Sequence, residues 1–290
     1  MIKSIAVFGA TGHIGLPVTI ALIEAGYKVS VLVRDVDVAK NLFPNEVEIV
    51  KGNIKYHHDL KKFLTNKDAV YCNLNVSPSE NRNSYHIETD GLRDIINASL
   101  ECGIKRIMYL SSLVQNYQGE NGFNWWAFDV KKEAINYVRD SGIPYTIFYP
   151  SNFMENFTNG YKHGRTLRLI GESRFPMFYI SVKDYSRMVV NSLKRTGNEE
   201  REYNIQGLNC YTIQEAAELF AIHYTKEKIK VKTMPIGLAK FLSLFYSQLK
   251  YDTKMAEALN NYEELFVGEL AWEELGKPEI TFEEFAKNAE

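Results

Sequence analysis

The stretch Gly9-Ala10-Thr11-Gly12-His13-Ile14-Gly15 directly follows the apolar run 4–8 and opens a segment with helical periodicity. In such a loop Gly9 permits a tight turn, Gly12 lets the backbone approach a ligand, and Gly15 lets helix and strand pack closely. The N–H groups that begin the helix favour a pyrophosphate. The alternative is a strand-to-helix turn that binds nothing. The place of the loop at the start of the chain favours dinucleotide binding, with contacts from Gly9, Thr11, Gly12, His13, Ile14 and Gly15.

Short β-branched runs alternate with helix-length periodic segments through the first two thirds of the chain, a pattern typical of successive βαβ units. The expected strands are 4–8, 28–33, 47–51, 69–73, 106–110, 145–149 and 178–182. The expected helices are 13–25, 57–64, 81–102, 125–141 and 184–194. Gly26, Gly103 and Gly142 stand where helices need a left-handed C-terminal cap. The pattern predicts an α/β fold of the Rossmann type, with a doubly wound parallel sheet.

The pattern changes after residue 151. Residues 152–174 carry no clear strand, and the chain after Gly207 reads as mostly helical, with Thr212 as an N-cap for helix 213–224 and a strand at 229–234. We predict an NAD(P)-binding Rossmann domain at 1–150, with 178–207 returning to its sheet, and a substrate-binding cap formed by 151–177 and 208–290. Because open α/β sheets bind ligands at the carboxyl ends of their strands, the substrate pocket is expected between the two parts.

Composition narrows the function classes. The 290 residues are 45% hydrophobic with a net charge of −2, which allows a large core and supplies no basic surplus for nucleic acid. The scattered cysteines Cys72, Cys102 and Cys210 form no metal-binding or redox pair, and His57-His58-Asp59 diverge on a helix, so no metal is expected. No run approaches the roughly 20 apolar residues of a membrane span. A cytoplasmic protein with a small-molecule substrate is expected.

The second strand ends in Val33-Arg34-Asp35, where an acidic residue suits the ribose hydroxyls of NAD and an arginine suits the 2′-phosphate of NADP. Arg34 holds the critical position, so NADP(H) is preferred, with NAD(H) as the alternative. Asp35 and Asp37 lie near enough to weaken that preference, because a carboxylate close to the phosphate costs about 1 to 3 kcal/mol.

Several segments together resemble the NmrA-like family of atypical short-chain dehydrogenases. They are the glycine loop, the strand end at Arg34-Asp35, Gly52-Asn53, the run 106–112 and the run 141–157, which contains Pro150-Ser151-Asn152-Phe153-Met154-Glu155-Asn156-Phe157. The resemblance covers about the first 190 residues, and the later helices look like the cap of extended members. That family contains NAD(P)H-dependent quinone oxidoreductases, dye reductases and redox-sensing regulators, and its relatives include nucleotide-sugar epimerases.

The resemblance implies cofactor contacts from Asn53, Ile54, Asn75, Val76 and Ser77. Related dehydrogenases carry a Tyr-x-x-x-Lys pair, and the family spacing places Lys131 on the lysine, where it would contact the nicotinamide ribose. The tyrosine position is Ala127, so the usual general acid is missing. Its loss costs about 100- to 10,000-fold in reactions that need the proton, which disfavours sugar epimerisation and alcohol oxidation.

Hydride transfer to a conjugated acceptor demands less of the protein, because the product delocalises its charge. Candidate substrate contacts are Ser111, Trp126, Tyr149 and Phe153, and an apolar pocket is expected from Phe153, Phe157, Phe241, Phe245 and Tyr246, although aromatics at helical spacing are more often core. The leading hypothesis is an NAD(P)H-dependent oxidoreductase acting on a quinone-like acceptor, with Lys131 as its catalytic residue. The rival is an NADP(H)-sensing regulator that binds a protein partner; an epimerase-like enzyme comes third.

Overall fold

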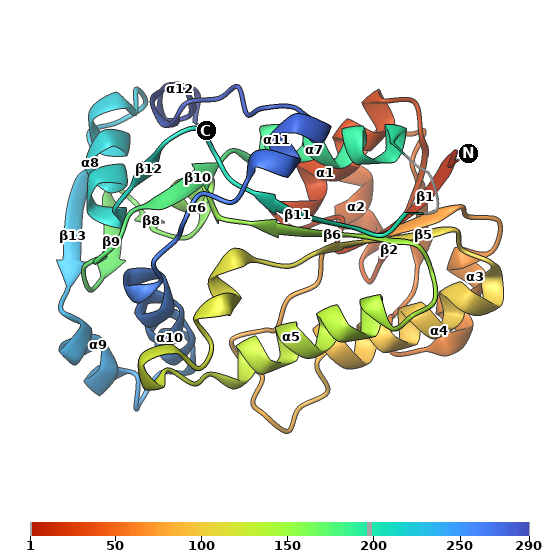
Figure 1. Cartoon of the computed structure of the whole chain (residues 1–290), viewed down its shortest axis with the longest axis horizontal. Helices are drawn as coiled ribbons and strands as arrows, with labels where there is room; N and C mark the ends of the chain where they lie inside the picture. Colours follow the sequence, from red (N-terminus) through yellow and green to blue (C-terminus); the bar gives the residue numbers. More distant parts are fainter. Residues whose placement is uncertain (1, 196–198, 290) are drawn as a thin grey trace.

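The computed structural model describes residues 2–195 and 199–289. Within these ranges seven strands form one parallel sheet in the order β11-β6-β5-β4-β1-β2-β3 (Figure 1). Its strands are β1 (Ser4–Phe8), β2 (Lys28–Val33), β3 (Glu48–Lys51), β4 (Ala69–Cys72), β5 (Arg106–Leu110), β6 (Tyr145–Pro150) and β11 (Arg201–Ile205). The predicted α/β fold is therefore confirmed, and the strand order is that of a doubly wound dinucleotide-binding sheet.

Helices cover both faces of this sheet, which explains why its strands are apolar at nearly every position. On one face lie α1 (Gly15–Glu24), α2 (Val36–Leu42), α7 (Val182–Lys194) and α11 (Glu269–Leu275). On the other lie α3 (His57–Leu64), α4 (Leu92–Cys102) and α5 (Trp126–Arg139). Figure 1 shows α3, α4 and α5 together below the sheet and α1, α7 and α11 above it. Two separate hydrophobic clusters fill the layers between helices and sheet.

Three helices end at the glycines that were predicted as left-handed C-terminal caps. Gly26, Gly103 and Gly142 all adopt positive φ, at 87°, 69° and 72°, as left-handed caps require. Thr212 caps α8 (Ile213–His223) through a reciprocal capping box with Glu215.

The helix predicted over 81–102 is wrong in its first part. Residues 81–84 form a turn in which Ser84 N–H donates to the Asn81 carbonyl, and helical structure begins with the π-helical turn η1 (Ile87–Gly91), which runs into α4. A second omission is α2, whose N-cap Asp35 accepts hydrogen bonds from the N–H groups of Asp37 and Val38. α2 has seven residues and buries Ala39, and this segment is too short to show a helical apolar period.

Beyond the carboxyl end of β6 the chain builds a smaller, mixed part. Within the described residues it contains two three-stranded sheets, in the orders β12-β10-β7 and β13-β9-β8. The strands are β7 (Asn152–Phe153), β8 (Lys162–His163), β9 (Thr166–Ile170), β10 (Met177–Ile180), β12 (Cys210–Tyr211) and β13 (Lys230–Met234). The helices are α6 (Asn156–Asn159), α8, α9 (Ile236–Leu242), α10 (Ser247–Asn261) and α12 (Phe282–Asn288). A third cluster of buried side chains forms the core of this part.

This arrangement corrects two predictions. Residues 152–174 contain β7, β8 and β9, although no strand was expected there. Of the segment 178–207, predicted to return to the main sheet, β11 does so, whereas β10 pairs with β7 and β12; residues 196–198 lie outside the described residues. β7 is two residues long and β8 likewise, too short for an alternating pattern to register.

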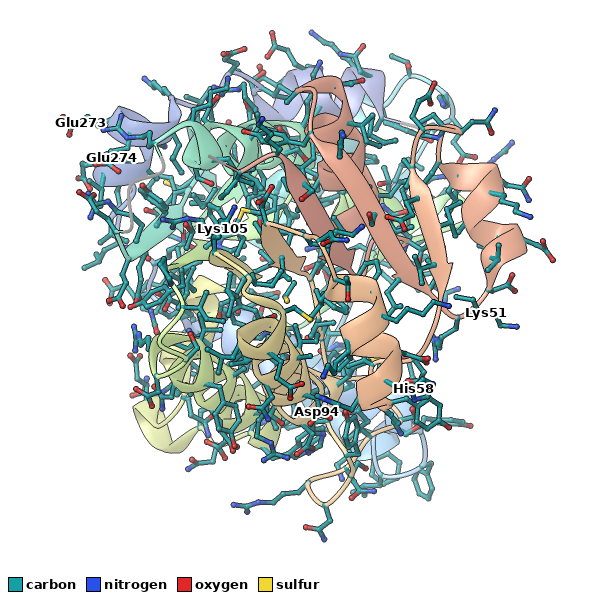
Figure 2. The ribbon with its side chains drawn as sticks, turned by 90° about the vertical axis from the view of Figure 1, so that its right-hand side faces the viewer. Lys51, His58, Asp94, Lys105, Glu273 and Glu274 are labelled. Atoms are coloured by element: carbon teal, nitrogen blue, oxygen red, sulfur yellow. The ribbon has the colours of Figure 1, made fainter. Side chains whose placement is uncertain are left out.

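Charged side chains of both signs cover the side of the molecule that Figure 2 faces, among them Lys51, Asp94, Lys105 and Glu273. Lys105, just before β5, pairs with Asp68 at 2.6 Å, and this contact together with Asp68's hydrogen bonds from Lys3 and Ser4 outweighs burial, so that the pKa of Asp68 lies well below its usual range. Among the described residues, none of the helices combines the length and the apolar character that crossing a bilayer demands.

Gly207 joins the two parts where the chain leaves β11 and crosses β10. A Cβ at Gly207 would lie 1.7 Å from the carbonyl oxygen of Tyr179, so the two backbones touch and only glycine fits. We expect Gly207→Ala to lower the unfolding free energy by about 1 to 3 kcal/mol through overpacking, measured by urea denaturation. Gly237→Ala is the matched control, since a Cβ there meets nothing within 4 Å. Equal unfolding free energies for Gly207→Ala and Gly237→Ala would contradict the close contact between the backbones at Gly207 and Tyr179.

Candidate functional site

The glycine loop borders a cavity at the point where the strand order reverses, between β1 and β4. The wall includes the loop residues Gly9, Thr11, Gly12, His13 and Ile14, then Asn73 and Asn75 after β4, and Phe153, Glu155, Asn156, Asn159 and Gly160 from the smaller part. The sequence predicted the loop, Asn75 and Phe153. Asn73, Glu155 and Asn156 were not foreseen.

The three loop glycines differ in what requires them. A Cβ at Gly9, where φ is +77°, would lie 2.0 Å from the carbonyl oxygen of Asn73. A Cβ at Gly15 would lie 2.0 Å from the carbonyl oxygen of Gly9. At Gly12, in contrast, the nearest atom is that same oxygen, at an ordinary 3.5 Å. Gly9 and Gly15 are therefore required by packing within the protein, whereas a Cβ at Gly12, which lines the cavity, would meet only ordinary contacts.

A second cavity continues from the first, with which it shares Ile14, Asn73, Asn75 and Phe153. It runs along the carboxyl ends of β5 and β6 and under α10. Its further lining includes Ser111, Ser112, Lys131, Pro150, Ser151, Tyr251, Met255 and Glu264. The structure thus brings together five predicted residues, Ile14, Asn75, Ser111, Lys131 and Phe153. The Ser111 hydroxyl is buried and finds no hydrogen-bond partner in the described parts of the chain, so a bound ligand would satisfy it.

Lys131 is held by a buried carboxylate that the sequence did not reveal. Glu88, on η1, is fully buried and forms an ion pair with the ammonium of Lys131. The Tyr109 hydroxyl donates to Glu88 Oε1 at 2.8 Å, and the Val76 N–H donates to Oε2 at 3.3 Å. Single π-helical turns such as η1 are frequent at functional sites. Glu88 thereby fixes the position of the Lys131 side chain on the cavity wall.

The position of the missing tyrosine is filled by apolar packing. Ala127 is buried in a cluster with Trp125, Phe128 and Ala258, the last of which comes from α10. Tyr251, also on α10, packs edge-on against Trp125 with ring centroids 4.9 Å apart and lines the second cavity. Burial raises the pKa of Tyr251 to about 12. α10 thus places the phenol of Tyr251 on the cavity wall, although no sequence motif identified this residue.

Two predicted substrate contacts lie away from both cavities. Trp126 stacks on His86 with ring centroids 4.9 Å apart. The Tyr149 hydroxyl donates to Glu202 at 2.8 Å, beside Arg139, on the face of the sheet that α5 covers. Neither side chain is part of the cavity lining. Of the five aromatic residues expected to form a pocket, Phe153 lines both cavities, whereas Phe157 is fully buried core and the side chains of Phe241, Phe245 and Tyr246 are mostly exposed.

The predicted adenosine contacts lie at the ends of β2, β3 and β4, outside the lining of the two cavities. Arg34 is exposed at the end of β2. Asn53 Oδ1 accepts the Lys55 N–H at 3.1 Å, and Ile54 lies against Gly91. Val76 N–H is bound to Glu88, and Ser77 N–H donates to Glu80 at 3.1 Å. The roles of Arg34, Asn53, Ile54, Val76 and Ser77 stay predictions.

Two carboxyl groups, one half-buried and one buried, border the cavities. Glu155 lies beside the glycine loop, and its Oε2 has no hydrogen-bond partner in the structure described. Glu264 lines the second cavity. Burial raises the pKa of each to about 7. Within residues 2–195 and 199–289, no three His, Cys, Asp or Glu side chains come together as a metal site.

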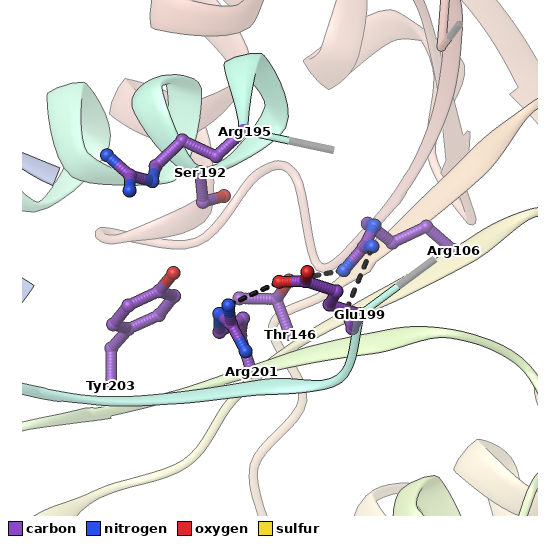
Figure 3. Close-up of a pocket in the computed structure, with 7 residues that line it drawn as sticks. All are labelled: Arg106, Thr146, Ser192, Arg195, Glu199, Arg201 and Tyr203. Atoms are coloured by element: carbon purple, nitrogen blue, oxygen red, sulfur yellow. Dashed lines mark hydrogen bonds and ion pairs between the residues drawn. The ribbon is translucent and has the colours of Figure 1, made fainter. Parts of the chain in front are cut away.

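A third cavity lies at the opposite, amino-terminal ends of β5, β6 and β11 (Figure 3). Its arginines are occupied: Arg106 donates to Thr146 Oγ1 at 2.9 Å and to the carbonyl of Glu199 at 3.1 Å, while Arg201 pairs with Glu199. Tyr203 donates to Glu274 at 2.6 Å. This network ties the edge strand β11 and α11 to the sheet, which is a structural role.

The Glu88–Lys131 pair should behave as a buried ion pair. We expect Glu88→Gln to lower the unfolding free energy by about 3 to 5 kcal/mol, because it leaves the ammonium without its counter-charge. Combining it with Lys131→Met should restore a large part of that loss. Denaturant unfolding of the two single variants and the double variant measures the coupling, and strictly additive losses would contradict the pair.

Comparison with known proteins places this chain in a family. The NmrA-like family matches residues 1–284. A photosystem II assembly factor, Ycf39, from Guillardia theta is 26% identical over 88% of this chain and 81% of its own. An NAD(P)H azoreductase from Xenophilus azovorans is 23% identical over 98% of this chain and 96% of its own. The crystal structure of the Citrobacter sp. triphenylmethane reductase complexed with NADP(H) superimposes with a TM-score of 0.77 at 17% identity, covering 99% of this chain and 100% of that one. The chain belongs to the NmrA-like family.

Proposed function

We propose that this protein is an NAD(P)H-dependent oxidoreductase that transfers a hydride to a small quinone-like or other conjugated acceptor. The observation that carries the proposal is that Gly12, on the cavity wall, lacks a side chain although packing would allow one. A turn without a ligand accounts for Gly9 and Gly15, because both touch backbone, but it gives no reason for a missing side chain at Gly12. A pyrophosphate that approaches the backbone there gives one.

The second cavity fits the nicotinamide end of such a cofactor. Ser111, whose hydroxyl has no partner among the described residues, and Lys131 both line this cavity, so donors are available for the ribose and the carboxamide. The bound cofactor would supply the hydride. The protein's own part is to orient cofactor and acceptor and to exclude water, which suffices for much of the rate of such reactions.

The end of β2 supports a preference for NADP(H). Asp35, which would repel a 2′-phosphate, has its carboxylate turned to the first N–H groups of α2, at 3.0 and 3.2 Å. Arg34 is left exposed at the same strand end. This geometry weakens the objection that Asp35 raises against NADP(H).

The acceptor class rests on two arguments. The relative from Xenophilus azovorans is named as an azoreductase and the Citrobacter structure as a triphenylmethane reductase, and azo and triphenylmethane compounds are conjugated. Ala127 leaves this chain without the usual tyrosine, which disfavours substrates that need a strong general acid. Quinones and conjugated dyes satisfy both conditions.

Substitutions at Gly12 and Gly15 should distinguish a glycine needed for cofactor binding from one needed for folding. We expect Gly12→Ala to weaken NADPH binding at least about 10-fold, which is about 1.4 kcal/mol, with the unfolding free energy unchanged within about 0.5 kcal/mol. Gly15→Ala, the matched comparison, should lower the unfolding free energy by about 1 to 3 kcal/mol, since its Cβ meets the Gly9 carbonyl. Calorimetric titration and urea denaturation measure the two effects. Unaltered NADPH affinity in Gly12→Ala would remove the main support for the proposal.

Turnover tests the enzyme directly. Purified protein mixed with NADPH and a panel of quinones, azo dyes and triphenylmethane dyes should oxidise the cofactor, which is measured as a loss of nicotinamide absorbance.

We expect Arg34→Ala to raise the Kd for NADPH about 10-fold or more, through loss of a charge-assisted contact, while the Kd for NADH stays unchanged. An equal change for both cofactors would argue against the assignment of Arg34.

A regulator without turnover is the second candidate. The relative from Guillardia theta is named as an assembly factor, and this chain exposes large apolar side chains at Leu238, Phe241, Leu244, Phe245 and Tyr246. Exposed apolar patches of this kind mark interaction sites. Tight NADPH binding without oxidation of any acceptor in the panel would favour this candidate.

A further inference from the structure

Glu264 is a buried carboxyl group on the wall of the second cavity. It lies between α10 and α11 and is 8% exposed. Ser151 Oγ donates to its Oε2 at 2.7 Å, and Gln206 Nε2 donates to its Oε1 at 2.7 Å. Within the described residues it forms no ion pair, so no cation stabilises its charged form.

Burial is the main reason that the pKa of Glu264 rises to about 7, against the opposing effect of the hydrogen bonds from Gln206, Ser151 and the Phe178 backbone. The titratable groups that face it are the phenols of Tyr179, from β10, and Tyr262, at the end of α10. Lys131 and Tyr251 line the same cavity. Glu264 therefore gains and loses a proton near neutral pH, the range in which general acids work best.

Ser151 connects Glu264 to the cavity. It follows Pro150 directly at the carboxyl end of β6 and lines the cavity together with Ser111 and Lys131. A hydroxyl group both donates and accepts. When Glu264 is protonated, its O–H can donate to Ser151 Oγ, and the Ser151 proton is then free to point into the cavity.

We propose that Glu264, acting through the Ser151 hydroxyl, supplies the proton that completes reduction of the acceptor, in place of the missing tyrosine. This assignment rests on the proposed hydride transfer. The acceptor gains a hydride with its electron pair as a C–H bond of the cofactor breaks, and negative charge develops on a conjugated oxygen or nitrogen. The Ser151 O–H proton passes to that atom and the Glu264 proton replaces it. Glu264, left as a carboxylate, regains a proton from water, so each turnover consumes one reduced cofactor and one proton.

The other groups in the cavity are less suited. The Lys131 ammonium is paired with Glu88, which holds it in place and compensates its charge. Tyr251 interacts with Asn75, and its pKa of about 12 makes it a much weaker acid than a carboxyl group that titrates near 7. A structural role for Glu264, anchoring the segment after α10 to Gln206 and Ser151, would use the same hydrogen bonds. The test must therefore separate proton supply from anchoring.

The variant E264Q separates the two, because a glutamine can still accept from Gln206 and donate to Ser151 yet cannot release a proton at neutral pH. For wild type we expect kcat to fall as pH rises through about 7, since the acid form is lost. In E264Q we expect kcat to be lower by about 100-fold or more below pH 7 and to be independent of pH, with NADPH affinity and melting temperature unchanged. S151A should also lose kcat. E283Q, which removes an exposed carboxylate of the cap, is the charge control.

A second readout needs no turnover. Infrared spectra of the cofactor-free protein should show protonated-carboxyl absorption that disappears as pH rises through about 7, from Glu155 and Glu264 together. E264Q should lose the part that belongs to Glu264, whereas E155Q should keep that part. An active wild type with an unchanged kcat and pH profile in E264Q overturns this assignment alone, and loss of activity in Y251F instead transfers the role to Tyr251. A wild type that binds NADPH and reduces no acceptor overturns the proposed function and this assignment together.

Discussion

The close contact between the loop after β1 and the end of β4 is the constraint on which the site depends. Gly9 lies against the carbonyl of Asn73, and Gly15 lies against the carbonyl of Gly9, with no room for a Cβ at either position. This contact sets the start of α1 at the point where the strand order reverses. The crevice outside the sheet opens there, and Gly12 is left facing it. The packing of Gly9 and Gly15 thus determines where the cavity lies. Gly12, which packing does not require, lets a ligand approach the backbone there.

The smaller part of the chain is held over this crevice by buried polar contacts as well as by its own core. Gln206 and Ser151, at the ends of β11 and β6, both bind Glu264 from the segment after α10. Buried polar groups of this kind are costly unless satisfied, so they specify one position of the segment. The groups that position the cap are therefore also groups on the cavity wall. Burial of Glu264 between the two parts therefore raises the pKa of a group that lines the cavity.

The sequence predicts the central sheet well because its strands are continuous apolar runs, and the bounds of β1, β2 and β5 agree with prediction. The glycine loop, Ser111, Lys131 and Phe153 come together for the same reason: parallel strands bring their carboxyl ends to one edge. Glu88, Tyr251 and Glu264 could not be foreseen. They carry no motif, and they reach the cavity through a π-helical turn or from segments more than a hundred residues away from the loop. Trp126 and Tyr149, predicted as substrate contacts, instead contact His86 and Glu202.

The loss of the tyrosine and the pairing of the lysine belong together. In a Tyr-x-x-x-Lys pair, the ammonium charge lowers the pKa of the phenol. Here Ala127 removes the phenol, and Glu88 compensates the ammonium with a carboxylate from which water is excluded. Lys131 keeps its position and its N–H donors, as a group that orients a ribose requires. It no longer has a phenol whose pKa it could lower. Under the proposed hydride transfer, an acceptor that needs a proton would take it from another group, and the cap brings the buried acid Glu264 to this cavity.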